Sequence, residues 1–262
     1  MDIRNHMAYL YNVSEREAVE LFHLFFLRAL FASTADKRLV AVKGGCNLRF
    51  FFGSVRYSED LDLDVKVTAR TTLEAKVDRL LASPTLTKPL LSHGVSLGTV
   101  SKPKQTDTTQ RWKLGLTHRA GQAHTKVEFS RRGTLDGTSF DAVSDGIVRQ
   151  HRIQPFLASH YALVGAVAQK IEALAGRSTP QARDVFDLGL LFAIAGATTP
   201  AIEMGARARI DAAISNAEAL SFDDYVGQVV AFLEPDQAAL HDSRETWELQ
   251  KQTVIARLGS LR

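Results

Sequence analysis

Charged and apolar positions alternate along residues 60–65. Asp60, Asp62 and Asp64 take every second position, and two leucines and a valine take the others. Successive side chains of an extended strand point to opposite faces, so this pattern predicts a strand with one acidic face and one face in a core. Three neighbouring carboxylates repel one another, and a bound cation relieves that repulsion. The pattern therefore predicts a metal site, and Mg²⁺ prefers such oxygen ligands.

A short apolar run and a glycine pair precede the acidic strand. Leu39 to Val42 contains β-branched residues, and Lys43-Gly44-Gly45 follows directly. Residues 46–52 suit a helix, so we expect a strand, a glycine turn and a helix in that order. Two glycines let the backbone come close to a phosphate, and the start of a helix adds partial positive charge. Together the two patterns predict a phosphate cradle beside a metal site.

The rest of the chain divides into a mixed half and a helical half. Ser14-x-x-Glu17 is a capping-box signal for a helix that runs to about Ala32. Later patterns predict a helix over 71–82 and strands over 95–101, 111–118 and 124–130, with a polar connection over 102–110. From about Ser159 we expect consecutive helices, over roughly 159–176, 180–195, 200–217, 221–233 and 236–258.

These motifs resemble those of one known family. Lys43-Gly44-Gly45, followed by Arg56-x-Ser58-x-Asp60-Leu61-Asp62, is similar to the motif of the AbiEii abortive-infection toxins, which include the mycobacterial MenT toxins. The family belongs to the DNA polymerase beta-like nucleotidyltransferase superfamily. Lys170 and Arg183-Asp184-x-x-Asp187-Leu188 resemble its lysine and its Arg-Asp-x-x-Asp-Leu motif, so the similarity spans about residues 39 to 190. Cys46-Asn47 departs from the family, which usually has Thr-Ala there.

The resemblance implies a fold. The expected class is α+β, with a polymerase beta-like nucleotidyltransferase core of mixed sheet and flanking helices, followed by a helical C-terminal region. We place the core in residues 1–150. Residues 151–262 are expected to form a helical domain that completes the active-site cleft.

The resemblance also implies an activity. It indicates a metal-dependent nucleotidyltransferase toxin of a toxin–antitoxin or phage-defence system, which transfers a nucleotide from a nucleoside triphosphate to an acceptor, foremost the 3′ end of tRNA. Mg²⁺, or Mn²⁺ in its place, is the implied cofactor, and a cognate antitoxin is the implied protein partner. The implied catalytic residues are Asp60, Asp62, Lys170 and Asp187, with Asp60, Asp62 and Glu128 as metal ligands. The implied nucleotide-binding residues are Lys43, Gly44, Gly45, Arg56, Ser58 and Arg183.

The acidic residues of the strands also have plain structural interpretations. Asp60 and Asp62 suit an exposed acidic edge that discourages pairing between sheets. Asp64 fits the site and the surface equally. Glu128 alternates with apolar residues and suits a solvated strand face as well as a metal site.

The helical motifs have structural alternatives too. Lys170 lies in an apolar helix, from which a lysine can reach solvent. Arg183, Asp184 and Asp187 fit an ion-pair ladder at helical spacing. The interval from Arg177 to Arg183 is slightly longer than in the family, which leaves open which aspartate takes the functional position.

Two other functions fit the same motifs. One is a transferase that modifies a protein hydroxyl, and the other is a catalytically silent module that binds nucleotide, nucleic acid or an antitoxin. The acidic pair argues against the silent module, because a protein without catalysis has no need for a costly cluster of like charges.

Basic residues gather around the middle strands. They suit a surface that follows a phosphate backbone, or an ordinary solvated face. Trp112 suits stacking on a base, or a place in the core. The basic residues are Lys102, Lys104, Arg111, Lys113, Arg119, Arg131 and Arg132.

Composition sets wider limits. The chain has 262 residues and 45% hydrophobic residues, which fits one or two compact domains. A single cysteine excludes an intrachain disulfide and suits a reducing cytoplasm, and the N-terminus lacks the pattern of a secretory signal. The richest apolar run, 21–31, is too short to span a bilayer. Net charge +3 permits a nucleic-acid partner without requiring one. The sequence has neither zinc-ligand spacing nor a Walker A motif.

Overall fold

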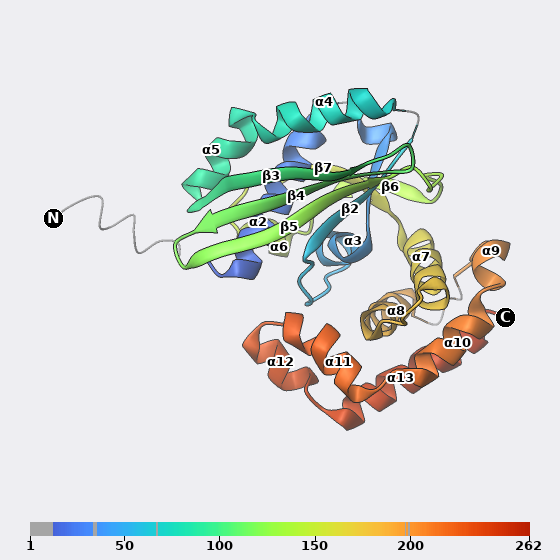
Figure 1. Ribbon diagram of the computed structural model, residues 1–262. Coiled ribbons are helices and arrows are strands. Elements are labelled where there is room, and N and C mark those ends of the chain that lie inside the picture. Colours follow the sequence, from blue (N-terminus) through green and yellow to red (C-terminus); the bar gives the residue numbers. More distant parts are fainter. Residues whose placement is uncertain (1–12, 34–35, 67, 197, 199) are drawn as a thin grey trace. The chain divides into compact units, whose positions relative to one another are not determined.

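The computed structural model describes residues 13–33, 36–66, 68–196, 198 and 200–262. Seven strands form one sheet in the order β3-β4-β5-β2-β1-β7-β6 (Figure 1). Both parallel and antiparallel pairs occur, so the expected α+β class with a mixed sheet is confirmed. The strands are β1 (Val40–Lys43), β2 (Asp60–Val65), β3 (Val95–Gln105), β4 (Thr109–His118), β5 (Gly121–Ser130), β6 (Thr138–Ala142) and β7 (Leu157–Tyr161).

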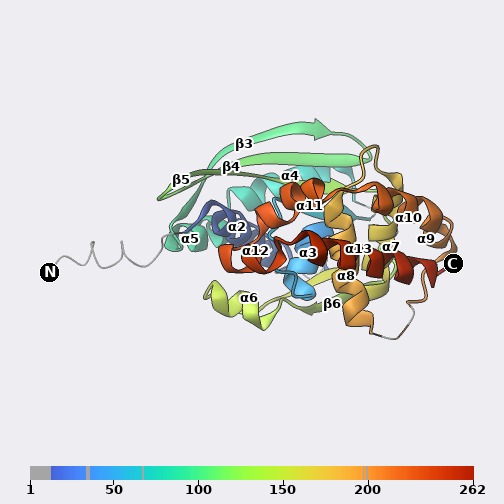
Figure 2. The same ribbon diagram turned by 90° about the horizontal axis from the view of Figure 1, so that it is seen from below.

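Strand pairing places β2, the acidic strand, beside the three antiparallel strands β3, β4 and β5. β3, β4 and β5 run antiparallel, and Figure 2 shows them side by side. β2 pairs in parallel with β5. On the other side of β2, the N–H of Lys66 donates to the carbonyl of Leu39 at 2.8 Å. β1 and β2 are therefore antiparallel, so β1 finishes at the end of the sheet where β2 begins.

The chain folds as two compact units, neither of which is continuous in sequence. The first unit takes in the described residues up to Val42, together with Ser58–Leu135 and Phe140–His160. The second unit takes in Lys43–Tyr57, Asp136–Ser139 and Tyr161–Arg262. The division into residues 1–150 and 151–262 stays a prediction.

Helix α2 (Glu15–Leu30) packs against the sheet in the first unit. Ser14 Oγ accepts a hydrogen bond from the N–H of Glu17 at 3.2 Å, and Glu17 Oε2 accepts one from the N–H of Ser14 at 2.9 Å, which confirms the capping box. α2 packs against β4 and β5, against α4 (Arg70–Leu81) and against α5 (Pro84–Ser92). Leu61 and Leu63 of β2 are fully buried, so the apolar face of the acidic strand lies in a core as predicted.

Helices make up most of the second unit. α7, α8, α10 and α13 pack on one another around buried residues such as Leu191 and Trp247. No helix within the described residues has the length and apolar character that a membrane crossing requires. The helices of this unit are α3 (Gly44–Phe51), α7 (Leu163–Gly176), α8 (Ala182–Ala195), α9 (Met204–Arg207), α10 (Ile210–Ala219), α11 (Phe222–Gln228), the 3-10 helix η2 (Val230–Phe232), α12 (Pro235–His241) and α13 (Arg244–Gly259).

The helical expectations need correction in several places. The helix expected from about residue 159 begins at Leu163, because the residues before it form β7. Val42 of β1 lies opposite His160 of β7, and this pairing outweighs the helical pattern of the segment. The helices expected over 200–217, 221–233 and 236–258 are each divided in two. In the last, Ser243 caps a new helix by accepting a hydrogen bond from the N–H of Thr246.

Some elements of the first unit were not expected at all. The polar connection is shorter than predicted, because β3 continues to Gln105 and β4 begins at Thr109. The additional elements are α5, the 3-10 helix η1 (Asp36–Arg38), α6 (Asp145–Gln150) and β6, of which β6 joins residues of both units.

A histidine is buried in the core of the first unit. His23 of α2 is 1% exposed, and its Nε2 lies 2.8 Å from Thr125 Oγ1. Burial lowers the pKa of His23 to about 3, although the carboxylate of Glu20 opposes the shift. His23 is therefore neutral in the folded protein at neutral pH.

We expect His23 to make stability depend on pH. Below about pH 6.5 the unfolded chain takes up a proton on this histidine, and the folded chain does not until about pH 3. This difference should lower the free energy of unfolding by about 2 kcal/mol between pH 7 and pH 5. His23→Gln should remove that part of the decrease, as measured by urea unfolding at both pH values. His124→Gln, at an exposed position, is the control; an undiminished decrease in His23→Gln would contradict the expectation.

Candidate active site

The acidic face of β2 carries two accessible carboxylates. Asp60 and Asp62 are partly exposed, whereas Asp64 is only 2% exposed. The hydroxyl of Ser58 donates to the carbonyl of Asp60 at 2.9 Å and holds the backbone at the start of the strand. The alternation predicted from the sequence is present, and it leaves the first two aspartates within reach of a ligand.

Cations from the neighbouring strands accompany these carboxylates. Lys126 Nζ lies 2.6 Å from Asp60 Oδ2, and Arg111 Nε donates to Glu128 Oε2 at 2.6 Å. The strand register explains the pairs, since Asp60 lies opposite Lys126 and Arg111 lies opposite Glu128. The side chains of Asp60 and Lys126 are 32% and 31% exposed. Pairs this exposed contribute about 0–1 kcal/mol, so a competing cation can replace the lysine at little cost.

Asp60 and Asp62 fit a magnesium ion. Mg²⁺ usually takes one or two protein carboxylates and keeps water or phosphate oxygens in its other positions. Glu128 lies opposite Asp62 on the adjacent strand, but its carboxylate is engaged by Arg111. Among the described residues, no three acidic, histidine or cysteine side chains are grouped to hold a metal ion. The three-carboxylate set of Asp60, Asp62 and Glu128 stays a prediction.

The glycine turn follows β1 as predicted. Gly44 begins α3 with φ +67°, a conformation that favours glycine. The first N–H groups of a helix have no partner within the helix and suit an anion. Asn47, which stands where the family usually has alanine, is buried and donates from Nδ2 to the carbonyl of Tyr161 at 2.9 Å. This residue therefore anchors α3 within the second unit.

The second unit contains a buried network of charges. Lys170 Nζ lies 2.9 Å from Asp184 Oδ1 and 2.6 Å from Asp187 Oδ2. Arg56 Nη2 lies 3.1 Å from Asp187 Oδ2, and Arg177 Nε lies 2.8 Å from Asp184 Oδ2. Both aspartates have no exposed surface. We name the buried residues Arg56, Lys170, Asp184 and Asp187, together with Arg177, whose side chain is 40% exposed, the charge network.

Mutual attraction favours the charged forms of Lys170 and Asp184. Burial by itself lowers the pKa of Lys170, but the carboxylates of Asp184 and Asp187 outweigh it and raise that pKa above its usual value. For Asp184, burial raises the pKa, and the charges of Lys170 and Arg177 outweigh it and lower the pKa. Lys170 therefore does not extend to solvent, and both aspartates of the motif bind cations. Arg183 is partly exposed.

Sequence reasoning missed the partners of these side chains. Arg56 and Asp187 are 131 positions apart, and local spacing gives no signal for such a pair. The same holds for Lys126, because its partner Asp60 lies on another strand. Trp112 is fully buried and donates from Nε1 to Asp78 Oδ1 at 3.1 Å, so it belongs to the core.

Solved structures share this fold. MenT4, a nucleotidyltransferase toxin from Mycobacterium tuberculosis, matches with a TM-score of 0.60 and 20% sequence identity, over 100% of this chain and 91% of that chain. JHP933 from Helicobacter pylori matches with a TM-score of 0.58 and 18% identity, over 95% of each chain. The fold is therefore that of a nucleotidyltransferase.

The sequence also matches a family. Residues 26–254 match the family described as nucleotidyl transferase AbiEii toxin, of type IV toxin–antitoxin systems. This chain belongs to the AbiEii nucleotidyltransferase toxin family, which confirms the resemblance seen in its motifs. None of the curated proteins matches the chain. Membership supports a transferase, and a toxin–antitoxin system implies an antitoxin and a nucleotide substrate.

We expect Lys170→Met to destabilise the protein. The change keeps the length of the side chain but leaves Asp184 and Asp187 buried with one cation fewer each. Removing one partner of a buried ion pair typically costs about 3–5 kcal/mol. Thermal and urea unfolding measure the loss, and Glu172→Gln, at an exposed position of the same helix, is the control. Equal unfolding midpoints for Lys170→Met and wild type would show that the ion pairs of Lys170 do not stabilise the protein.

Proposed function

We propose that this protein is a Mg²⁺-dependent nucleotidyltransferase toxin that transfers a nucleotide from a nucleoside triphosphate to the 3′ end of tRNA. The observation that carries the proposal is the pair of accessible carboxylates on one face of β2, Asp60 and Asp62. They lie on the strand next to β1 in the sheet, and Gly44 and Gly45 follow β1 in the sequence. A carboxylate pair of this kind suits a metal ion that acts on phosphate.

The donor's phosphates are assigned to the glycine turn. Gly44 and Gly45 offer backbone N–H groups at the start of α3, and Lys43 and Ser58 flank the motif. These assignments rest on the chemistry of the residues and on the family's motif.

The family's remaining cations are assigned to the charge of the triphosphate. They are Arg56, Lys170 and Arg183. In the second unit Asp187 binds both Arg56 and Lys170, so we assign it the role of orienting these two cations.

The reaction is a displacement at the α-phosphorus. The acceptor hydroxyl forms an O–P bond, the bond to the oxygen that bridges to the β-phosphate breaks, pyrophosphate leaves and the hydroxyl proton is released. A bound Mg²⁺ supplies positive charge that stabilises the phosphate oxygens in the transition state. Asp60 and Asp62 would hold it, and the protein contributes mainly position and charge.

Toxin–antitoxin membership supports an acceptor that the cell needs for growth, and tRNA is such a molecule. A cognate antitoxin that opposes the toxin is the corresponding protein partner. We place the reaction in the cytoplasm, where tRNA and nucleoside triphosphates meet. A role in phage defence is part of the same proposal.

We expect Asp60→Asn and Asp62→Asn to abolish transfer without unfolding the protein. Each removes one charged oxygen ligand, worth several kcal/mol in the transition state, so the rate should fall by roughly a hundredfold or more. The assay incubates each protein with Mg²⁺, total tRNA and each labelled nucleoside triphosphate in turn. Circular dichroism checks the fold, and Asp145→Asn, whose side chain is 72% exposed on α6, is the matched control.

The other outcomes are distinct. Label on protein instead of RNA would point to a protein hydroxyl as acceptor. Nucleotide binding without transfer to RNA or protein would indicate a silent binding module. Loss of the fold in both asparagine variants would make Asp60 and Asp62 structural residues and overturn their assignment.

A further inference from the structure

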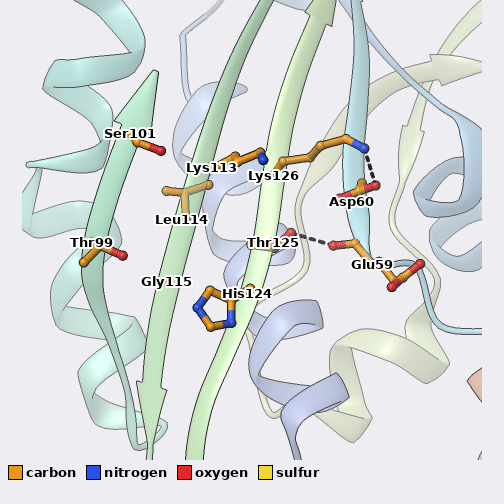
Figure 3. A pocket seen from close by; sticks show the side chains of 10 residues that line it. All are labelled: Glu59, Asp60, Thr99, Ser101, Lys113, Leu114, Gly115, His124, Thr125 and Lys126. Carbon is orange, nitrogen blue, oxygen red and sulfur yellow. Dashed lines mark hydrogen bonds and ion pairs between the residues drawn. The ribbon is translucent and has the colours of Figure 1, made fainter. Parts of the chain in front are cut away.

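A cavity lies on the face of the first unit's sheet that does not carry α2 and α5 (Figure 3). Its volume is about 470 Å³, and residues of β2, β3, β4 and β5 line it. Asp60, at one side, is the carboxylate proposed as a metal ligand. Thr99 and Ser101 of β3 lie at the other side. The cavity therefore begins at the proposed reaction centre and extends away across the sheet.

The cavity contains a cross-strand pair of like charges. Lys113 of β4 lies directly opposite Lys126 of β5, and both side chains line the cavity. Two like charges at opposite positions destabilise a sheet, since their Cβ atoms are about 5 Å apart. Asp60 neutralises Lys126 at 2.6 Å, whereas Lys113 is exposed and forms no ion pair within the described part of the chain. A bound anion would neutralise this second charge.

The neighbouring basic residues have other partners. Lys102 Nζ binds Glu74 and Asp78 of α4 at 2.7 and 2.9 Å, and Arg111 binds Glu128. Arg131 donates to the side-chain oxygen of Gln110 at 2.5 Å. Lys113 thus differs from these neighbouring basic residues, because its charged group faces the cavity.

Polar groups around Lys113 suit a phosphate. The hydroxyls of Thr99 and Ser101 on β3 and the ring of His124 on β5 line the same cavity, on either side of β4, which carries Lys113 (Figure 3). Gly115 leaves room for Thr99, because a Cβ at residue 115 would lie 2.6 Å from Thr99 Oγ1. Hydroxyls, an imidazole and an ammonium group are all donors to phosphate oxygens.

We propose that Lys113, His124, Thr99 and Ser101 bind the phosphate backbone of the RNA acceptor. This inference rests on the proposed function. It places the acceptor's 3′ hydroxyl beside Asp60 and a preceding phosphate beside Lys113. Two strand spacings, about 10 Å, separate β2 from β4.

The donor's triphosphate fits this position less well. In the sheet order, β1 lies on one side of β2, and β5 and β4 lie on the other. β1, which precedes the glycine turn in sequence, therefore lies on the other side of β2 from Lys113 of β4. A displacement also requires attacking and leaving oxygens on opposite sides of the phosphorus. We therefore assign Lys113 to the acceptor's phosphates and not to the donor's.

The test measures binding as well as activity. Fluorescence anisotropy of a labelled single-stranded RNA of about 12 nucleotides gives the affinity of the full-length protein. Lys113→Met should weaken RNA binding roughly five- to tenfold at about 50 mM salt and reduce the slope of log affinity against log salt by about 0.7. Binding of nucleoside triphosphate should stay within about twofold of wild type. The variant loses only a contact to an RNA phosphate and keeps the residues assigned to the triphosphate.

A matched control removes the same charge elsewhere. Lys88 is exposed on α5, which packs against β3 from the other face, so Lys88→Met should bind RNA like wild type. Wild-type RNA affinity and salt slope in Lys113→Met would overturn the inference. So would an equal loss in Lys88→Met, or a loss of nucleotide binding alone in Lys113→Met, which would assign the cavity to the donor.

The two proposals fail separately. If wild type transfers label to tRNA and Lys113→Met retains the KM for tRNA, the inference is overturned and the proposed function stands. If wild type transfers no label but RNA binding depends on Lys113, the proposed function fails and the phosphate site stands.

Discussion

The parallel pairing of β2 with β5 determines which charges of the first unit meet. Five residues of each strand are in register, from Asp60 opposite Lys126 to Asp64 opposite Ser130. A shift by one residue would turn the aspartates into the core and the leucines to the surface. Burial of Leu61 and Leu63 therefore selects the register, and the register in turn places a lysine beside the first carboxylate. Hydrophobic packing on one face of β2 fixes the electrostatics of the other.

In the second unit, Asp184 and Asp187 are fully buried, whereas Asp60 and Asp62 of the first unit are partly exposed. The carboxylates of Asp184 and Asp187 are excluded from water, and two cations bind each of them. Burial of such charges is costly unless each is paired and hydrogen-bonded. The residues of the family's motif thus serve the packing of this unit as well as any chemistry. In contrast, the ion pairs on the sheet face of the first unit remain partly exposed and are open to competition by other ions.

Much of the fold follows from local patterns. The capping box of α2, the alternation of β2 and the glycine start of α3 each have a signal within a few residues, and each is present in the structure. Segments whose state depends on distant partners were misjudged. Leu157–Tyr161 is a strand because it pairs with β1, which is more than a hundred positions earlier. The helical half is divided more often than the apolar period indicates, and Ser243 caps one of the additional helix starts.

The contacts of the candidate active-site residues also depend on partners that are distant in the sequence. Strand alternation singled out Asp60 and Asp62, and the family resemblance singled out Lys170 and Asp187. The pairs that join Lys126 to Asp60 and Arg56 to Asp187 come from tertiary structure alone. A pattern within one strand or helix gives the face on which a side chain lies. It does not give the partner that the side chain meets.

The interleaving of the two units has a consequence for synthesis of the chain. Segment 43–57 belongs to the second unit, whose other residues begin only at 136. Arg56 leaves the ribosome 131 residues ahead of Asp187, its buried counter-ion. At typical elongation rates that interval is on the order of ten seconds. The nascent chain carries the glycine turn and α3 without their packing partners for this time. A nearly complete toxin on the ribosome therefore still lacks a finished second unit.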